Sequence, residues 1–180
     1  TVAIVGIGLI GSSIARGIQK NKIARNVFGY AKTDSTRAKA RELGYMDKIF
    51  DTLVETVNDA DLIILCAPVG SNAEIMRNIQ GHLKKGSIIT DVGSVKKAVI
   101  DQIDKYLPDG VSFIPGHPIA GTEFSGPESG FAELFYKKCC LLTPYTDTDK
   151  VHLDKVVFFW EELGMFVDIM SPEMHDLVLA

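Results

Sequence analysis

Short apolar runs alternate with longer amphipathic segments from Thr1 to Gly116. The apolar runs predict five β-strands, at Thr1–Val5, Asn26–Tyr30, Asp61–Ala67, Ser87–Val92 and Val111–Gly116. Between them, apolar residues recur at helical spacing in 9–20, 34–43, 71–83 and 95–107. Strands that alternate with helices in this way indicate an α/β fold of the Rossmann type, a mostly parallel sheet with helices on both faces.

The alternation changes after Ser125. Two more strands are predicted at Cys139–Pro144 and Met165–Met170, with a helix over 147–163 between them. Ser171 then suits a helix N-cap and Pro172 the first helical position. We therefore expect one nucleotide-binding domain over 1–170 and the start of a helical extension over 171–180. We also expect a longer parent protein, because the last helical pattern runs to the end of the sequence.

A glycine-rich turn joins the first predicted strand to the first predicted helix. Its "GIGLIG" places Gly6, Gly8 and Gly11 in the G-x-G-x-x-G pattern, inside a βαβ unit. In such turns the first glycine permits the tight turn, the second lets the backbone approach a pyrophosphate, and the third lets the helix pack closely. The pattern predicts dinucleotide binding by these glycines with Leu9 and Ile10, against the alternative of a simple strand–helix turn.

The end of the second predicted strand bears on which dinucleotide is bound. NAD sites usually carry an acidic residue there, about 20 residues after the glycine loop. The position falls on Tyr30 or Ala31, and neither is acidic. We expect NAD, and NADP stays possible because Ala31 replaces the usual acidic residue. Lys32 and Arg37 could meet a 2′-phosphate, or could belong to a solvated helix face. Asp34 comes slightly late for the ribose-binding acidic residue and could equally be a plain helix cap.

Ligands in such folds bind beyond the carboxyl ends of the strands. After the third strand, the small residues Ala67, Pro68 and Val69 leave room for a flat ring, or form a plain turn. Ser94 follows the fourth strand, either at the site or as a helix cap. His117 follows the fifth strand in the loop-like stretch "GHPIAGTE", and a neutral imidazole can take a proton near pH 7.

Composition and charge bear on which partners the protein can have. Net charge is −4 and the Lys and Arg residues form no long cluster, which argues against a nucleic-acid partner. No apolar run reaches the roughly 18 residues that a membrane span needs. The three Cys lack CxxC spacing, so we expect a reducing cytoplasm. The four His show no metal-ligand spacing, so we expect no metal site. We also expect His82 and His152 to be exposed to solvent.

Four blocks together carry a family resemblance over essentially the whole chain: "VGIGLIGSSIA", "DVGSVK", "GHPIAGTEFSG" and "MSPEMHD". They resemble prephenate dehydrogenases, also called arogenate or cyclohexadienyl dehydrogenases. The resemblance implies NAD(P)-dependent oxidative decarboxylation of prephenate to 4-hydroxyphenylpyruvate, or of arogenate to tyrosine, in tyrosine biosynthesis. It also implies a homodimer formed through a helical C-terminal domain, which in this family supplies another His and a substrate-binding Arg.

The resemblance also implies residue roles. By similarity, His117 takes the proton of the ring hydroxyl while hydride passes to the nicotinamide, and Ser94 holds that hydroxyl. Thr122 and Glu123 would shape the substrate end of the pocket, and Asp176 would lie at the domain junction. Two other hypotheses are a hydroxyacid dehydrogenase, which would use a Lys as the proton acceptor, and an NAD-sensing module without chemistry. A His at the strand edge does not suit the first, and the second has no use for His117, Thr122 and Glu123 together.

Overall fold

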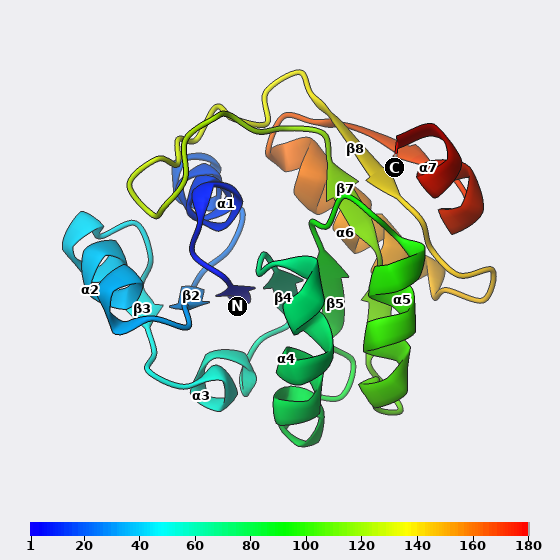
Figure 1. Cartoon of the computed structure of the whole chain (residues 1–180), viewed down its shortest axis with the longest axis horizontal. Helices are drawn as coiled ribbons and strands as arrows, with labels where there is room; N and C mark the ends of the chain where they lie inside the picture. Colours follow the sequence, from blue (N-terminus) through cyan, green and yellow to red (C-terminus); the bar gives the residue numbers. More distant parts are fainter. Residues whose placement is uncertain (180) are drawn as a thin grey trace.

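The computed structural model describes residues 1–179 and has a parallel sheet at its centre (Figure 1). Six strands form it, β1 (Val2–Val5), β2 (Val27–Tyr30), β3 (Lys48–Ile49), β4 (Leu62–Leu65), β5 (Ile88–Asp91) and β6 (Ser112–Ile114), in the order β3-β2-β1-β4-β5-β6. Every neighbouring pair in this sheet is parallel. This is the strand order of dinucleotide-binding Rossmann folds, and it confirms the expected fold class.

Helices cover both faces of this sheet. α1 (Leu9–Asn21), α2 (Asp34–Leu43) and α6 (Lys150–Glu162) contribute to the core on one face. α3 (Leu53–Val57), α4 (Asn72–Ile79) and α5 (Lys97–Ile103) contribute to the core on the other. Successive residues of β1 enter opposite cores, Val2 and Ile4 on the α1 side and Ala3 and Val5 on the α4 side. The central strands are apolar throughout because both faces are buried.

The sequence pattern predicts a loop from Gly116 onwards, and the structure differs at the start of this stretch. Gly116–Pro118 forms β7, which pairs antiparallel with β8 (Cys139–Leu142). β9 (Phe166–Ile169) extends β8 in parallel, so the three strands make a second sheet beside the first. Pro118 has no backbone N–H to donate. It is tolerated because β7 is an edge strand, which has a neighbouring strand on one side only.

Several element bounds differ from the predicted ones. The helices expected over 71–83 and 95–107 each end early and continue as 3₁₀ turns, at Gln80–His82 and Asp104–Tyr106. A further 3₁₀ turn, Val69–Ser71, precedes α4. β3 and α3 are too short to show a period in the sequence, and no pattern predicts them. α2 ends at the expected Gly44 cap, which has φ +68°.

The chain closes with α7 (Pro172–Leu179), which lies against the N-terminal side of α5. The backbone N–H of Met174 donates to Ser171 Oγ at 3.2 Å, so Ser171 caps α7 as expected. None of the helices within residues 1–179 is both long enough and apolar enough to cross a bilayer.

Candidate active site

The glycine loop has the geometry that its spacing predicts. Gly6 has φ +104°, and a Cβ there would lie 2.6 Å from the backbone N of Ala67, just after β4. A Cβ on Gly11 would lie 2.1 Å from the carbonyl oxygen of Gly6, so only glycine lets α1 start this close to β1. Gly8, the N-cap of α1, faces open space and has no side-chain cap. The first N–H groups of α1 are therefore available to an anion.

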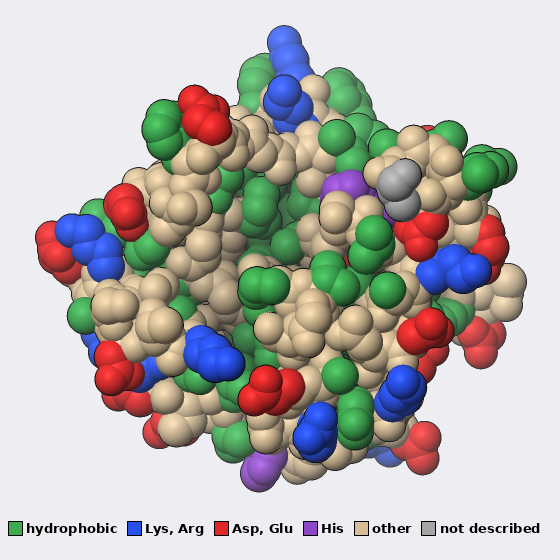
Figure 2. Space-filling view, viewed as in Figure 1, with side chains coloured by type: hydrophobic (Ala, Val, Ile, Leu, Met, Phe, Trp, Pro, Cys, Tyr) green, Lys and Arg blue, Asp and Glu red, His purple; other side chains and the backbone are tan. Residues whose placement is uncertain are grey.

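A cavity of about 800 Å³ opens at the carboxyl ends of β1, β2 and β4. Figure 2 shows this hollow, with hydrophobic side chains lining its floor. Seven of the ten residues predicted to bind the cofactor line it: Gly6, Gly8, Ala31, Lys32, Ala67, Pro68 and Val69. Leu9, Ile10 and Gly11 do not line the cavity, because they belong to the first turn of α1 and pack behind the loop.

A distant segment closes one side of the cavity. Gly126 and Pro127 line it, although they lie more than a hundred residues after the glycine loop. Tyr45 Oη donates to Pro127 O at 3.1 Å, and Phe131 N donates to Ser13 Oγ at 3.1 Å. Burial raises the pKa of Tyr45 to about 12, so its hydroxyl keeps its proton and stays a donor. These bonds hold the segment across the start of α1 (Figure 1).

The end of β2 carries no carboxylate toward the cavity. The lining there consists of Tyr30, Ala31, Lys32, Thr33 and Thr36. An acidic lining residue, Glu74, comes from the other side, on α4. The cap of α2 is not Asp34, as the sequence allowed, but Thr33, whose Oγ1 accepts from Thr36 N at 3.3 Å.

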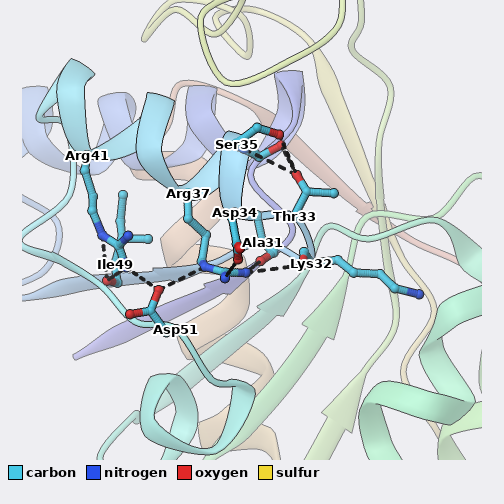
Figure 3. Close-up of polar contacts among 10 residues, drawn as sticks. Ala31, Lys32, Thr33, Asp34, Ser35, Arg37, Arg41, Ile49 and Asp51 are labelled. Carbon is cyan, nitrogen blue, oxygen red and sulfur yellow. Dashed lines mark hydrogen bonds and ion pairs between the residues drawn. The ribbon is translucent and has the colours of Figure 1, made fainter.

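Arg37 is not free to meet a phosphate, although the sequence left that open. Its Nη1 donates to the carbonyl oxygens of Ala31 at 2.6 Å and Lys32 at 3.2 Å. Its other nitrogens contact Asp34 and Asp51, as Figure 3 shows. The Lys32 side chain points away from this cluster (Figure 3) and is exposed. Arg37 therefore fixes the backbone that presents Lys32.

His117 belongs to β7 and contacts a second histidine. Its Nδ1 lies 2.8 Å from Nε2 of His175, a fully buried side chain on α7. Nδ1 of His175 lies 2.8 Å from Oδ1 of Asp176. Asp176 also accepts from the backbone N–H groups of Lys96 at 2.8 Å and Lys97 at 3.0 Å. The sequence patterns assign no role to His175; the only signal is its place in the "MSPEMHD" block.

A buried ion pair ties β7 to the main sheet. Lys96 Nζ donates to Asp91 Oδ2 at 2.6 Å and to Gly116 O at 2.5 Å, and both side chains are inaccessible to solvent. Asp91 also accepts from Gly116 N at 3.0 Å and from Gly93 N at 2.8 Å. Because Gly93 lines the cavity and Gly116 precedes His117, one carboxylate joins the cavity wall to the histidine strand. No sequence pattern singles out this pair.

His117 is a neutral imidazole at pH 7. Burial of the ring lowers its pKa to about 4; repulsion from a protonated His175 and from Lys96 acts in the same direction, and Asp176 opposes this only in part. A neutral imidazole is the form that accepts a proton.

The three residues predicted to contact the substrate beside His117 do not line the cavity. Ser94, Thr122 and Glu123 are all exposed, and none of them lines the cavity. The alternative of Ser94 as a helix cap is wrong, because α5 begins at Lys97 and Asp176 accepts from its first N–H groups instead. Thr122 Oγ1 accepts from Phe124 N at 3.2 Å.

The two histidines expected at the surface differ. His82 is exposed, as expected. His152 is only partly exposed, because its Nδ1 lies 2.6 Å from Ser112 Oγ on β6, so the expectation of an exposed side chain is wrong there. Neither histidine lies near the cavity lining.

Comparison with known proteins decides the family. The model of the prephenate dehydrogenase nucleotide-binding domain matches residues 14–168. The chain belongs to the prephenate dehydrogenase family. A cyclohexadienyl dehydrogenase of Zymomonas mobilis is 41% identical over 179 residues, which cover 99% of this chain and 61% of that protein. The resemblance carried by the four sequence blocks is thus confirmed.

Solved structures of this family superpose closely on the chain. A prephenate dehydrogenase from Aquifex aeolicus, in complex with hydroxyphenyl propionate and NAD⁺, has a TM-score of 0.90 at 34% identity. An arogenate dehydrogenase from Synechocystis has a TM-score of 0.89 at 30% identity. Each match covers 98% of this chain and 62% of the other, so the chain spans less than two thirds of these family members.

Proposed function

We propose that the protein catalyses the NAD(P)-dependent oxidative decarboxylation of prephenate, or of arogenate, in tyrosine biosynthesis. The observation that carries the proposal is the neutral His117, linked through Gly116 and Asp91 to the wall of a dinucleotide-sized cavity. Membership of the prephenate dehydrogenase family supports this reaction over that of other hydroxyacid dehydrogenases and over a sensing module.

The residues present fit a dinucleotide. The cavity falls in the size range of ordinary ligand pockets, about 300–1,000 Å³, and the open space at Gly8 suits a pyrophosphate against the N-terminus of α1. Gly6, Gly8, Leu9, Ile10 and Gly11 would shape this end of the site. Ala67, Pro68 and Val69 would border the ring at the other end. A bound nicotinamide supplies the acceptor for hydride from the substrate.

The chain's own task in the reaction is proton transfer and positioning. His117 takes the proton of the substrate's ring hydroxyl while hydride leaves the same carbon, which forms a ring carbonyl. Departure of CO₂ then sends an electron pair to the carbonyl oxygen as the ring becomes aromatic, and this oxygen takes the proton back from His117. In this proposal Ser94 orients the hydroxyl, and Thr122 and Glu123 border the substrate. None of these three side chains lines the cavity, so in this proposal substrate binding draws them towards the ligand.

We propose further that the site accepts NADP as well as NAD. A carboxylate after β2 would bind the ribose hydroxyls and repel a 2′-phosphate, but the residue there is Ala31. Lys32 offers an ammonium group, and Thr33 and Thr36 offer hydroxyls, on the same wall. Arg37 supports the proposal only indirectly, since its guanidinium is bound by Ala31, Lys32, Asp34 and Asp51.

The domain boundary and the assembly also belong to the proposal. Residues 1–170 would form the nucleotide-binding domain, and 171–180 would begin a helical region that pairs two copies of a cytoplasmic enzyme. The apolar side chains that α7 exposes support a packing partner there: Met174, Leu177, Val178 and Leu179.

The test is the oxidation of prephenate by the full-length protein with NAD⁺ or NADP⁺, followed by nicotinamide absorbance. We expect turnover of prephenate or arogenate, with a loss of about 10²–10⁴-fold in kcat in His117→Asn. The exposed His82→Asn variant is the matched control and should keep full activity. Equal activity in His117→Asn and His82→Asn would contradict the role of His117.

A further inference from the structure

Three side chains from two elements form a continuous hydrogen-bonded chain. It runs from Asp176 through His175, both on α7, to His117 on β7, with 2.8 Å at each of its two contacts. His175 lies at its centre and is completely buried. Both ring nitrogens of His175 are engaged, Nδ1 by Asp176 and Nε2 by His117.

The proton positions in this chain follow from Asp176. Burial works to raise the pKa of this carboxyl, but the N–H groups of Lys96 and Lys97 and the contact with His175 outweigh it and lower the pKa overall. Asp176 is therefore ionised near neutral pH, and a carboxylate can only accept hydrogen bonds. Nδ1 of His175 must then carry the proton of that contact, which in a neutral imidazole leaves Nε2 with a lone pair.

The lone pair on His175 decides the state of His117. Nε2 of His175 can only accept, so Nδ1 of His117 must donate, and the proton of the neutral His117 ring sits on Nδ1. Its Nε2 is then an unprotonated acceptor. Within residues 1–179, no hydrogen bond is made by that Nε2.

We propose that Asp176 and His175 are positioning residues that hold His117 in the tautomer whose Nε2 can accept a substrate proton. This rests on the proposed function only for the identity of the proton donor; the tautomer itself follows from the contacts. The arrangement resembles in its logic the Asp–His pair of serine hydrolases, where loss of the correct tautomer costs about 10⁴-fold in kcat. Here a second imidazole stands between the carboxylate and the base.

The surroundings keep the chain in one arrangement. Asp176 is anchored by two backbone N–H groups at the start of α5, so its carboxylate has little freedom to turn away. The strand that carries His117 is held by Asp91 and Lys96, through the N–H and carbonyl of Gly116. The charged side chains that act on His117 from these elements are Lys96 and Asp176. The base is set correctly only while α7 docks on α5 and β7.

Substitutions of His175 separate positioning from packing. In His175→Gln, the amide NH₂ donates to Asp176, which can only accept, and the amide oxygen then faces Nδ1 of His117 and keeps its tautomer. In His175→Leu, a side chain of similar bulk offers no acceptor. Glu173→Gln, on the exposed side of α7, is the control.

The readouts are the histidine tautomers and the steady-state kinetics of the full-length protein. Long-range ¹H–¹⁵N correlation spectra should show His117 protonated on Nδ1 in the wild type, in His175→Gln and in Glu173→Gln. We expect kcat to fall about 10²-fold in His175→Leu, with KM and the NAD⁺ dissociation constant within about threefold, and to recover largely in His175→Gln.

Two results would overturn the proposal. One is a His117 ring protonated on Nε2 in the wild-type protein. The other is an equal loss of kcat in His175→Gln and His175→Leu, which indicates a packing role alone. If the protein oxidises neither prephenate nor arogenate while the spectra show the Nδ1–H tautomer, the proposed function fails and the positioning of His117 stands.

Discussion

The buried pair of Lys96 and Asp91 offers a sharp test of how the histidine strand is held. Lys96→Met keeps the length and bulk of the side chain but removes the ammonium group. It leaves the Asp91 carboxylate buried with only the N–H groups of Gly93 and Gly116, and it removes the donor to Gly116 O. Breaking a buried pair in this way destabilises proteins by about 3–5 kcal/mol, because the remaining charge has lost its partner.

The geometry places the effect at the upper part of the range for single substitutions. Both side chains are fully buried, and their charged atoms lie 2.6 Å apart. At about 2–4 °C per kcal/mol for a chain of this size, the melting temperature should fall by at least several degrees. Lys97→Met, at the next and exposed position, should change stability by less than about 0.5 kcal/mol.

Urea unfolding of the 180-residue chain measures these changes. The chain has a single Trp, and Trp160 is completely buried, so its fluorescence reports the loss of the core. In Lys96→Met/Asp91→Asn the uncompensated charge is gone, so the double variant should be more stable than the sum of the single effects predicts. A Lys96→Met variant as stable as Lys97→Met would show that the buried pair does not stabilise the fold.

Three further predictions concern the cofactor, the base and the closing segment. Ala31→Asp should weaken NADP⁺ binding at least tenfold while NAD⁺ affinity changes less than threefold, measured by calorimetry; equal changes would contradict the role of Ala31. Because the pKa of His117 is lowered to about 4, kcat/KM should stay level as pH falls from 7 and drop only near pH 4, and a midpoint near 6.5 would be inconsistent. Gly130→Ala places a Cβ 2.2 Å from Ser12 Oγ, so cofactor affinity and thermal stability should both fall, and an unchanged dissociation constant would contradict the closing role.

The Rossmann fold was predictable from sequence because its signals are local. The apolar runs of β1, β4 and β5 and the periodicity of α1 each lie within a few residues, and the glycine loop marks their junction. β3 is too short to show alternation. β7 escaped prediction for a different reason, because its pairing with Cys139–Leu142 depends on residues more than twenty positions away.

The candidate site was predictable only in part for a similar reason. His117 stands out because it follows a strand at the edge of a dinucleotide fold. His175 and Lys96 do not, since their meaning depends on contacts between α7, α5 and β7 that no spacing along the chain encodes. For Arg37 the sequence position suggests a contact that the structure does not provide. Its position suggests a phosphate contact, but its guanidinium donates to Ala31 O and to Asp51 instead.

We propose that His117 is the proton acceptor of an NAD(P)-dependent prephenate or arogenate dehydrogenase. The most direct test of this role is the rate of nicotinamide reduction by the full-length protein with each substrate. The rate is compared between the wild type and a His117→Asn variant that is as stably folded as the wild type. We expect turnover of at least one of the two substrates, lowered about 10²–10⁴-fold in His117→Asn. Undiminished turnover in His117→Asn, or no nicotinamide reduction with either substrate, would contradict it.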